Sequence, residues 1–212
     1  VQSNPFSTFK CRTPKTRKTL WTREQVKQFL DYAYSNFKTR NLGLIVQMAY
    51  EWCQRIGDMR LLKFEYIDFD NGILHLEQSK RRATVHLPIS DELLSMLVQQ
   101  KEYYGFQEDV APTPNAIRGA YKPYSLHGIS KLGRKAMSSA GLSNELRLAD
   151  LRRTGTTEMV EAGVSMGQIM SVTGHTNPNS VMPYMKNTYL SAKKALTTRE
   201  SVVISTRQVP NS

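Results

Sequence analysis

The chain has 212 residues, in which 29 Lys and Arg against 18 Asp and Glu leave a net charge of +11 and a pI near 9.7. No apolar run approaches the roughly 20 residues that a membrane-spanning helix needs. Cys11 and Cys53 are too few for a disulfide or zinc framework, and the N-terminus lacks the order of a secretion signal. We expect a soluble protein of a reducing cytoplasm whose partner is polyanionic: nucleic acid in first place, with an anionic membrane surface or no specific partner as alternatives.

The composition divides the chain into three parts. Residues 1–19 are basic and rich in Thr, Ser and Pro, and predict a linker. Residues 20–198 carry the periodic apolar pattern of one compact domain. Residues 199–212 predict a tail, although the run at 201–205 also suits a strand.

Apolar spacing predicts a mainly helical fold. The first helix begins at Thr22, because Gln25 stands at the capping-box position. Further helices are predicted over 42–52, 90–103, 125–140, 147–162, 165–172, 179–185 and 191–196.

One segment changes from the helical period to the strand period. Alternating apolar residues on both sides of the Asp70-Asn71-Gly72 turn predict a small three-stranded antiparallel sheet over 67–89. Residues 105–123 have no clear period and predict a loop. The fold class is therefore mainly α with a small antiparallel β-sheet (α+β).

Three clusters contain residue types suited to phosphate chemistry. The first places Arg55 three residues before Asp58, just after a buried helix. The guanidinium group presents paired donors that match two phosphate oxygens, and a carboxylate can orient it. The alternative is an Arg–Asp pair that only pins a helix end.

The second cluster, Asp150-Leu151-Arg152-Arg153, opens a helix whose N-terminal peptide groups also favour an anion. We expect one of the two arginines to point inward; the alternative is a solvated basic turn.

The third cluster is a turn in which Gly174 closes a helix and is followed by His175. Tyr184 follows nine residues after that histidine. Taken singly, His175 suits a surface position and Tyr184 suits packing.

In this order and spacing, the clusters resemble the tyrosine recombinase (phage integrase) family. Its catalytic domains carry an arginine motif, a hairpin lysine, an H-x-L-R-R helix start, a Gly-His turn and a tyrosine nine residues further on. The matching segments are Gln54-Arg55-Ile56-Gly57-Asp58, Gln78-Ser79-Lys80, Asp150-Leu151-Arg152-Arg153 and Gly174-His175 with Tyr184. The resemblance covers about residues 20–196 and implies that 20–198 is the catalytic domain.

The resemblance implies a role for each matched residue. Tyr184 would attack the scissile phosphate to give a 3′-phosphotyrosine, with Arg55 and Arg152 clamping the phosphate oxygens. His175 would assist the clamp, and Lys80 would protonate the leaving 5′-oxygen. The reaction would need no metal, cofactor or ATP. The remaining assignments are Asp58 as the support of Arg55, and Arg81, Arg82 and Arg153 as DNA contacts; a solvated hairpin tip is the alternative for Lys80 to Arg82.

Two positions keep alternatives open. The family usually has histidine or lysine three residues before the second arginine, where this chain has Ala149. A different group, water, a shifted register or a slow enzyme would account for the difference. Tyr189, five residues beyond Tyr184, is a second candidate nucleophile. His86 and His127 lie in other elements and are predicted to be structural.

The predicted function is site-specific DNA recombination, preferably integration and excision of a phage or mobile element, including viral genome integration. The alternatives are a catalytically weakened DNA-binding module and a DNA-relaxing enzyme of the type IB topoisomerase class. The predicted partners are double-stranded DNA, further copies in a homotetramer on DNA, and accessory DNA-bending proteins. The expected location is the bacterial host cytoplasm or nucleoid. Family members usually have a helical domain before the catalytic one, so residues 1–19 would join the two.

Overall fold

The computed structural model describes residues 18–80, 82–116, 118–185, 192–193 and 195–200. It is mainly helical with one three-stranded antiparallel sheet, as the sequence predicted. The α-helices are α1 (Arg23–Tyr34), α2 (Phe37–Glu51), α3 (Ile56–Met59), α4 (Asp91–Tyr104), α5 (Leu126–Ser139), α6 (Leu151–Ala162) and α7 (Met166–Thr173). Short 3₁₀ turns are η1 (Phe64–Tyr66), η2 (Leu148–Asp150), η3 (Pro178–Ser180) and η4 (Met182–Tyr184).

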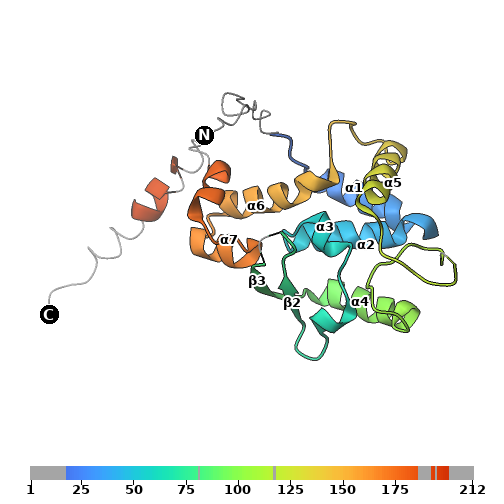
Figure 1. The fold of residues 1–212 in the computed structure, drawn as a ribbon. Coiled ribbons are helices and arrows are strands. Elements are labelled where there is room, and N and C mark those ends of the chain that lie inside the picture. Colours follow the sequence, from blue (N-terminus) through green and yellow to red (C-terminus); the bar gives the residue numbers. More distant parts are fainter. Residues whose placement is uncertain (1–17, 81, 117, 186–191, 194, 201–212) are drawn as a thin grey trace, which may run out of the picture.

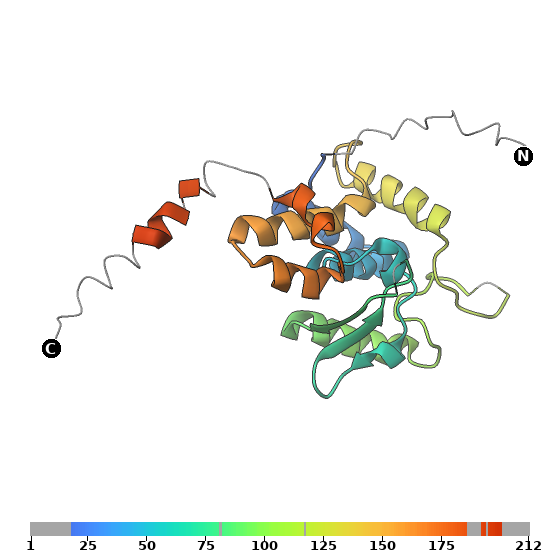
Figure 2. The ribbon, with the colours of Figure 1, turned by 60° about the vertical axis from the view of Figure 1, so that its left-hand side comes forward.

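Helix α2 is the centre of the molecule. Its residues 41–49 are all buried, because other elements cover it on every side. Figure 1 shows α6, α1 and α5 on one side of α2, and the sheet with α4 on the other, an arrangement that Figure 2 repeats from a second direction. The site elements α3 and α6 thus pack directly on this central helix, while α7 packs on α6 and β3.

The helix starts follow capping chemistry. Thr22 accepts a hydrogen bond from the Gln25 backbone while the Gln25 side chain accepts one from the Thr22 backbone, which completes the predicted capping box. Ser165 and Gln168 form a second capping box at α7. Such reciprocal pairs satisfy two orphan N–H groups and fix where each helix begins.

The second helix begins five residues before the predicted start. Asn36 caps it by accepting from the Lys38 backbone. The first turn carries the 66% exposed Phe37 beside Lys38 and Arg40. The dense apolar run that marked the helix begins only after this turn, so the apolar pattern alone missed it.

The sheet has the order β1 (Ile67–Asp68), β2 (Ile73–Glu77), β3 (Thr84–Pro88). Leu74 pairs with Leu87 and Leu76 with Val85, and all four side chains are buried. The alternating residues face outward and are exposed on β3 and at His75 and Glu77 of β2. The period of two therefore places one face of the hairpin on the core and the other in solvent.

The described part of the loop over 105–123 contains no helix, and one isolated bridge pairs Lys63 with Asp109. The predicted helix over 179–185 consists of the 3₁₀ turns η3 and η4. Residues 192–193 and 195–200 are helical, so the tail predicted from residue 199 begins inside a helical segment. The linker up to residue 17 and the strand or tail at 201–212 lie outside the described residues.

In the part of the chain that the structure describes, no helix is long and apolar enough to cross a membrane.

Candidate active site

Arg55 owes its position to the way α2 ends. The N–H of Gln54 donates to the carbonyl of Ala49 and the N–H of Cys53 to that of Tyr50, which is the Schellman pattern. Cys53 takes the left-handed position with φ of 51°, where glycine is usual. The chain reverses there, so that Gln54 enters the core and Arg55 takes the N-cap position of α3.

Asp58 joins α3 to the β2–β3 hairpin. Its Oδ2 lies 3.5 Å from Nη1 of Arg55, while its Oδ1 accepts hydrogen bonds from the backbone and hydroxyl of Ser79. Oδ2 accepts no hydrogen bond within the described residues, so the ion pair is its main stabilisation. Asp58 therefore touches Arg55, the residue that the sequence assigned it to support.

Two buried glutamines connect the arginines. Nη1 of Arg55 donates to Oε1 of Gln78 at 3.0 Å, and Nε2 of Gln78 donates to Oε1 of Gln54 at 2.6 Å. The same Gln54 oxygen accepts from Nη1 of Arg152 at 3.4 Å. Both glutamines are fully buried. Neutral amides thus link two cationic side chains without adding a carboxylate between them.

Arg152 is the inward-pointing arginine that the sequence predicted. It is 9% exposed, and its Nη2 donates to the carbonyl of Thr173 at 2.6 Å. Burial, followed by the charge of Arg55, lowers the pKa of Arg152 to about 10, so it remains charged at pH 7. A buried cation next to a second cation favours the arrival of an anion.

His175 follows Gly174, which ends α7 in the left-handed conformation with φ of 67°, as predicted. The Thr173 hydroxyl donates to the Ile169 carbonyl at 2.7 Å and lies 2.8 Å from Nδ1 of His175. Because its one hydrogen is used, the hydroxyl accepts from Nδ1–H. Nε2 of the neutral ring then accepts from Nη2 of Arg152, 3.3 Å away.

These side chains line one cleft of about 710 Å³. Its wall includes Arg55, Arg152, His175 and Tyr184, together with the exposed Ala149. Tyr184 is half-buried at the end of η4, a turn packed against α6. The position usually occupied by histidine or lysine in the resembled family thus faces the cleft with a methyl group.

Those of the remaining sequence candidates that the structure describes do not line this cleft. Lys80 and Arg82 are exposed at the hairpin tip and do not line the cleft. Arg153 is half-buried, and its Nη1 is buried with no hydrogen-bond partner in the described part of the chain. Arg81 and Tyr189 lie outside the described residues. His86 and His127, predicted to be structural, are both exposed.

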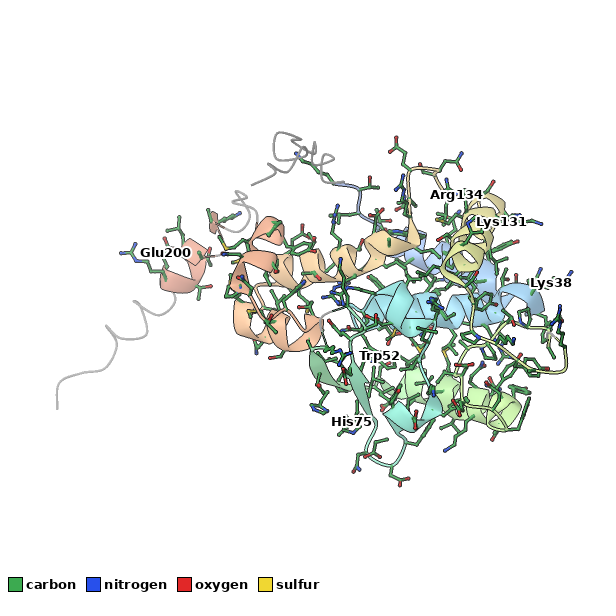
Figure 3. The ribbon with its side chains drawn as sticks, in the orientation of Figure 1. Lys38, Trp52, His75, Lys131, Arg134 and Glu200 are labelled. Atoms are coloured by element: carbon green, nitrogen blue, oxygen red, sulfur yellow. The ribbon has the colours of Figure 1, made fainter. Side chains whose placement is uncertain are left out.

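The sequence interpretation missed the basic side of α5. Arg134 lines the cleft, and Lys131 and Lys135 line a neighbouring hollow of about 620 Å³ that shares Arg134. Figure 3 shows Lys131 and Arg134 on α5. Lys and Arg at positions 131, 134 and 135 have the helical spacing of one face, which was a readable signal.

No group of three or more His, Cys, Asp or Glu that could hold a metal ion occurs among residues 18–185, leaving aside the undescribed 81 and 117, or in the described helical segment beyond. The cleft offers the guanidinium groups of Arg55, Arg134, Arg147 and Arg152, together with an imidazole and a phenol. This set can bind a phosphate group and bring a nucleophile to it.

The phage integrase family profile matches residues 20–190. The tyrosine recombinase XerA of Pyrococcus furiosus is 28% identical over 194 residues, which cover 87% of this chain and 64% of XerA. The shufflon-specific DNA recombinase of Escherichia coli is 24% identical over 151 residues, 70% of this chain and 36% of that protein. The chain thus spans less than two thirds of these relatives.

Solved structures show the same fold. The Tn1549 transposon integrase in complex with transposon right end DNA gives a TM-score of 0.71 at 13% identity, over 95% of this chain and 72% of that one. The lambda integrase tetramer bound to a Holliday junction gives 0.67 at 21% identity, over 88% and 53%. With most of its length matched by the family profile, the chain belongs to the phage integrase family.

Proposed function

We propose that this chain is the catalytic part of a site-specific DNA recombinase that cuts and rejoins double-stranded DNA through Tyr184. The observation that carries the proposal is the meeting of Arg55, Arg152, His175 and Tyr184 around one cleft. These residues come from four separate elements, α3, α6, the turn after α7, and η4. The net charge of +11 favours a nucleic-acid partner.

The arginines form the phosphate clamp. Arg55 and Arg152 bind the non-bridging oxygens of the scissile phosphate and stabilise the charge that develops there. Arg55 uses only Nη1 in its contacts with the described residues, so Nη2 and Nε remain as donors. Nε2 of His175 accepts from Arg152 in the structure. If Nε2 instead carries a proton, His175 can donate a further hydrogen bond to the phosphate.

The chemical step is a phosphoryl transfer without net hydrolysis. The phenol oxygen of Tyr184 attacks phosphorus, the bond from phosphorus to the 5′-oxygen breaks, and a 3′-phosphotyrosine forms. Lys80 gives a proton to the leaving 5′-oxygen, and the Tyr184 proton passes to solvent. A 5′-hydroxyl of the same or another strand reverses the step, so the bond energy is retained.

The further assignments extend this proposal. Residues 20–198 form the catalytic domain, with residues 1–19 as a basic linker and 199–212 as a tail. Arg81, Arg82, Arg153 and the basic side of α5 contact backbone phosphates. Integration and excision of a phage or mobile element is the preferred biological reaction, in a bacterial cytoplasm or nucleoid. It proceeds in a homotetramer on DNA with accessory DNA-bending proteins, and a tetrameric assembly is described for lambda integrase.

A catalytically weakened DNA-binding module is the second candidate. Ala149 favours it, because an exposed methyl group lines the cleft where the family usually supplies a side chain that handles protons. If the missing group limits the rate, Ala149→His should raise covalent cleavage by about ten-fold or more, within the range of general acid–base catalysis. A DNA-relaxing enzyme would differ from the recombinase because it needs no second duplex, and from the weakened module because it cleaves DNA.

The test is covalent adduct formation on supercoiled plasmid in excess EDTA, quenched with detergent. Wild type is compared with Tyr184→Phe, Tyr189→Phe and Ala149→His. An adduct that only Tyr184→Phe abolishes supports the proposal and assigns the nucleophile. Loss only in Tyr189→Phe keeps the chemistry and overturns the assignment, while adducts only with Ala149→His support the weakened module.

A further inference from the structure

The solvent face of the β2–β3 hairpin carries two of the four histidines of the chain. His75 and His86 stand directly opposite each other in the register, between the pairs Ile73 with Pro88 and Glu77 with Thr84. Both are exposed, because their neighbours Leu74, Leu76, Val85 and Leu87 take the buried face. Figure 3 shows His75 on the outside of the sheet, far from the labelled Arg134, which lines the cleft.

The two imidazoles face each other through the same ring atom. Nδ1 of His75 lies 2.7 Å from Nδ1 of His86, with ring centroids 4.9 Å apart and planes at 71°. At this separation one nitrogen must carry the single hydrogen and the other must accept it. A cation that replaces this proton would lie next to two ring nitrogens.

The geometry suits a metal ion with a small adjustment. Zinc–imidazole bonds of about 2.0–2.1 Å at a tetrahedral angle put the two nitrogens about 3.3 Å apart. The rings must therefore separate by roughly 0.6 Å, which rotation of two exposed side chains on a sheet surface can supply. Cross-strand neighbours on one face have the Cβ spacing that such a pair requires.

The surroundings favour a cation and leave coordination positions open. Glu77 lies on the same solvent face as His75. Asp68 of β1 pairs with Ile73, which lies two residues before His75 on β2. The described residues offer no third ligand, so water or an outside group would complete the shell.

We propose that His75 and His86 form a surface site for a late first-row divalent transition metal ion such as Zn²⁺, Ni²⁺ or Cu²⁺, which staples β2 to β3. Imidazole nitrogen is a preferred ligand of these ions, whereas Mg²⁺ and Ca²⁺ prefer oxygen. The stapled strands carry Gln78 and Lys80 at their far end, so the ion stabilises the hairpin that links the cleft to its tip. The site stands independently of the recombinase proposal.

The experiment is calorimetric titration and thermal unfolding of the tag-free chain with ZnCl₂ or NiCl₂ alone, without DNA. A ligand that binds only the folded state raises the unfolding temperature, and we expect a saturable rise with one equivalent bound. His75→Gln and His86→Gln each leave one imidazole and should weaken binding at least ten-fold. His127→Gln, the matched control, removes an exposed histidine of α5 and should bind like wild type.

Because both residues are exposed, the variants should keep the wild-type unfolding temperature without metal, apart from the small contribution of the pair. Nitrogen NMR of the histidine rings should show the metal at Nδ1 of residues 75 and 86. Three results would overturn the site: no saturable binding by wild type up to millimolar Zn²⁺, equal binding after His75→Gln or His86→Gln, or ring signals that change only at Nε2.

Discussion

Two residues of one hairpin, Gln78 and Lys80, have opposite surroundings although a single residue separates them. Gln78 is fully buried and makes side-chain hydrogen bonds to Arg55, Gln54 and the carbonyl of Thr173. Lys80 is exposed and forms no side-chain hydrogen bond or ion pair within the described residues. The hairpin therefore has a base immobilised inside the site, whereas Lys80 at its tip is not held.

The difference separates two kinds of proposed catalytic group. The proposed phosphate clamp is already held in place without DNA, because Arg55 and Arg152 are fixed by glutamines and by a backbone carbonyl. Fixed dipoles and charges need no reorganisation during the reaction, which is why they stabilise a transition state well. If Lys80 is the acid, we expect it to take its place only when DNA binds the tip. Substitutions of buried residues should therefore slow cleavage through the clamp. Changes in the contacts between the hairpin tip and DNA should slow it through the acid.

Replacing the buried arginine should have the largest effect. In Arg152→Lys, one ammonium group cannot reach Gln54, Thr173 and His175 as the guanidinium fork does. We expect adduct formation to slow by about a hundred- to a thousand-fold, the usual loss for one oxyanion donor. Single-turnover cleavage measures this, and urea unfolding checks the fold. A loss of only a few-fold would show that the clamp does not depend on this geometry.

Replacing the tip lysine should slow cleavage, and a substrate with a better leaving group should restore the rate. Lys80→Met removes the proposed acid, and we expect a loss of about a hundred-fold. A substrate with sulfur in place of the leaving 5′-oxygen needs no acid, because a thiolate leaves readily. The sulfur substrate should therefore restore Lys80→Met but not Arg152→Lys. Equal restoration of both variants, or of neither, would argue against Lys80 as the acid.

A substitution at the end of α7 that displaces Gln78 at the base of the hairpin should have an intermediate effect on stability. A Cβ at Gly174 would lie 2.7 Å from Nε2 of the buried Gln78, and the residue has φ of 67°. We expect Gly174→Ala to lower the free energy of unfolding by about 2–4 kcal/mol, from left-handed strain and displaced hydrogen bonds. Urea unfolding measures the loss.

Gly141→Ala is the control for this substitution. Gly141 also follows a helix with positive φ, of 71°, but its nearest contact to an added Cβ is 3.6 Å. Gly141→Ala should therefore lose only the stability that the left-handed strain costs, and it should cleave DNA at the wild-type rate. If both variants lose the same stability, then contact with Gln78 contributes nothing.

The sequence predicted the helices, the sheet and the Gly174 helix end because each depends on local chemistry. Apolar period, capping residues and turn residues are properties of neighbouring positions. That one of the two arginines points inward was also predicted, from the apolar residues of the helix. In the structure the buried residues of α6 besides Leu151 and Arg152 are three threonines and a glycine. The start of α2 was predicted too late, because its first turn is exposed and carries no apolar stripe.

The glutamine bridge was not predictable in the same way. Gln54 and Gln78 are 24 residues apart and meet through their amides only after the hairpin folds onto α3. Glutamine is common on surfaces, so neither its type nor its spacing indicates burial. The pairing of His75 with His86 likewise depends on the strand register, which only the folded hairpin defines.

The smallest effect on stability is expected at Ser79, which lies between Gln78 at the base of the hairpin and Lys80 at its tip. Ser79→Ala removes the hydroxyl that donates to Oδ1 of Asp58 but keeps the backbone donor. We expect a loss of about 1–2 kcal/mol in the free energy of unfolding, because the buried carboxylate keeps other partners. Ser79→Thr retains a hydroxyl at an exposed position and should unfold like wild type. If DNA alone positions Lys80, then Ser79→Ala should cleave within a few-fold of wild type on both the normal and the sulfur substrate. A large loss of cleavage on the normal substrate that the sulfur substrate restores would instead mean that Asp58 fixes the tip before DNA binds. The contrast between Gln78 and Lys80 would then have no consequence for catalysis.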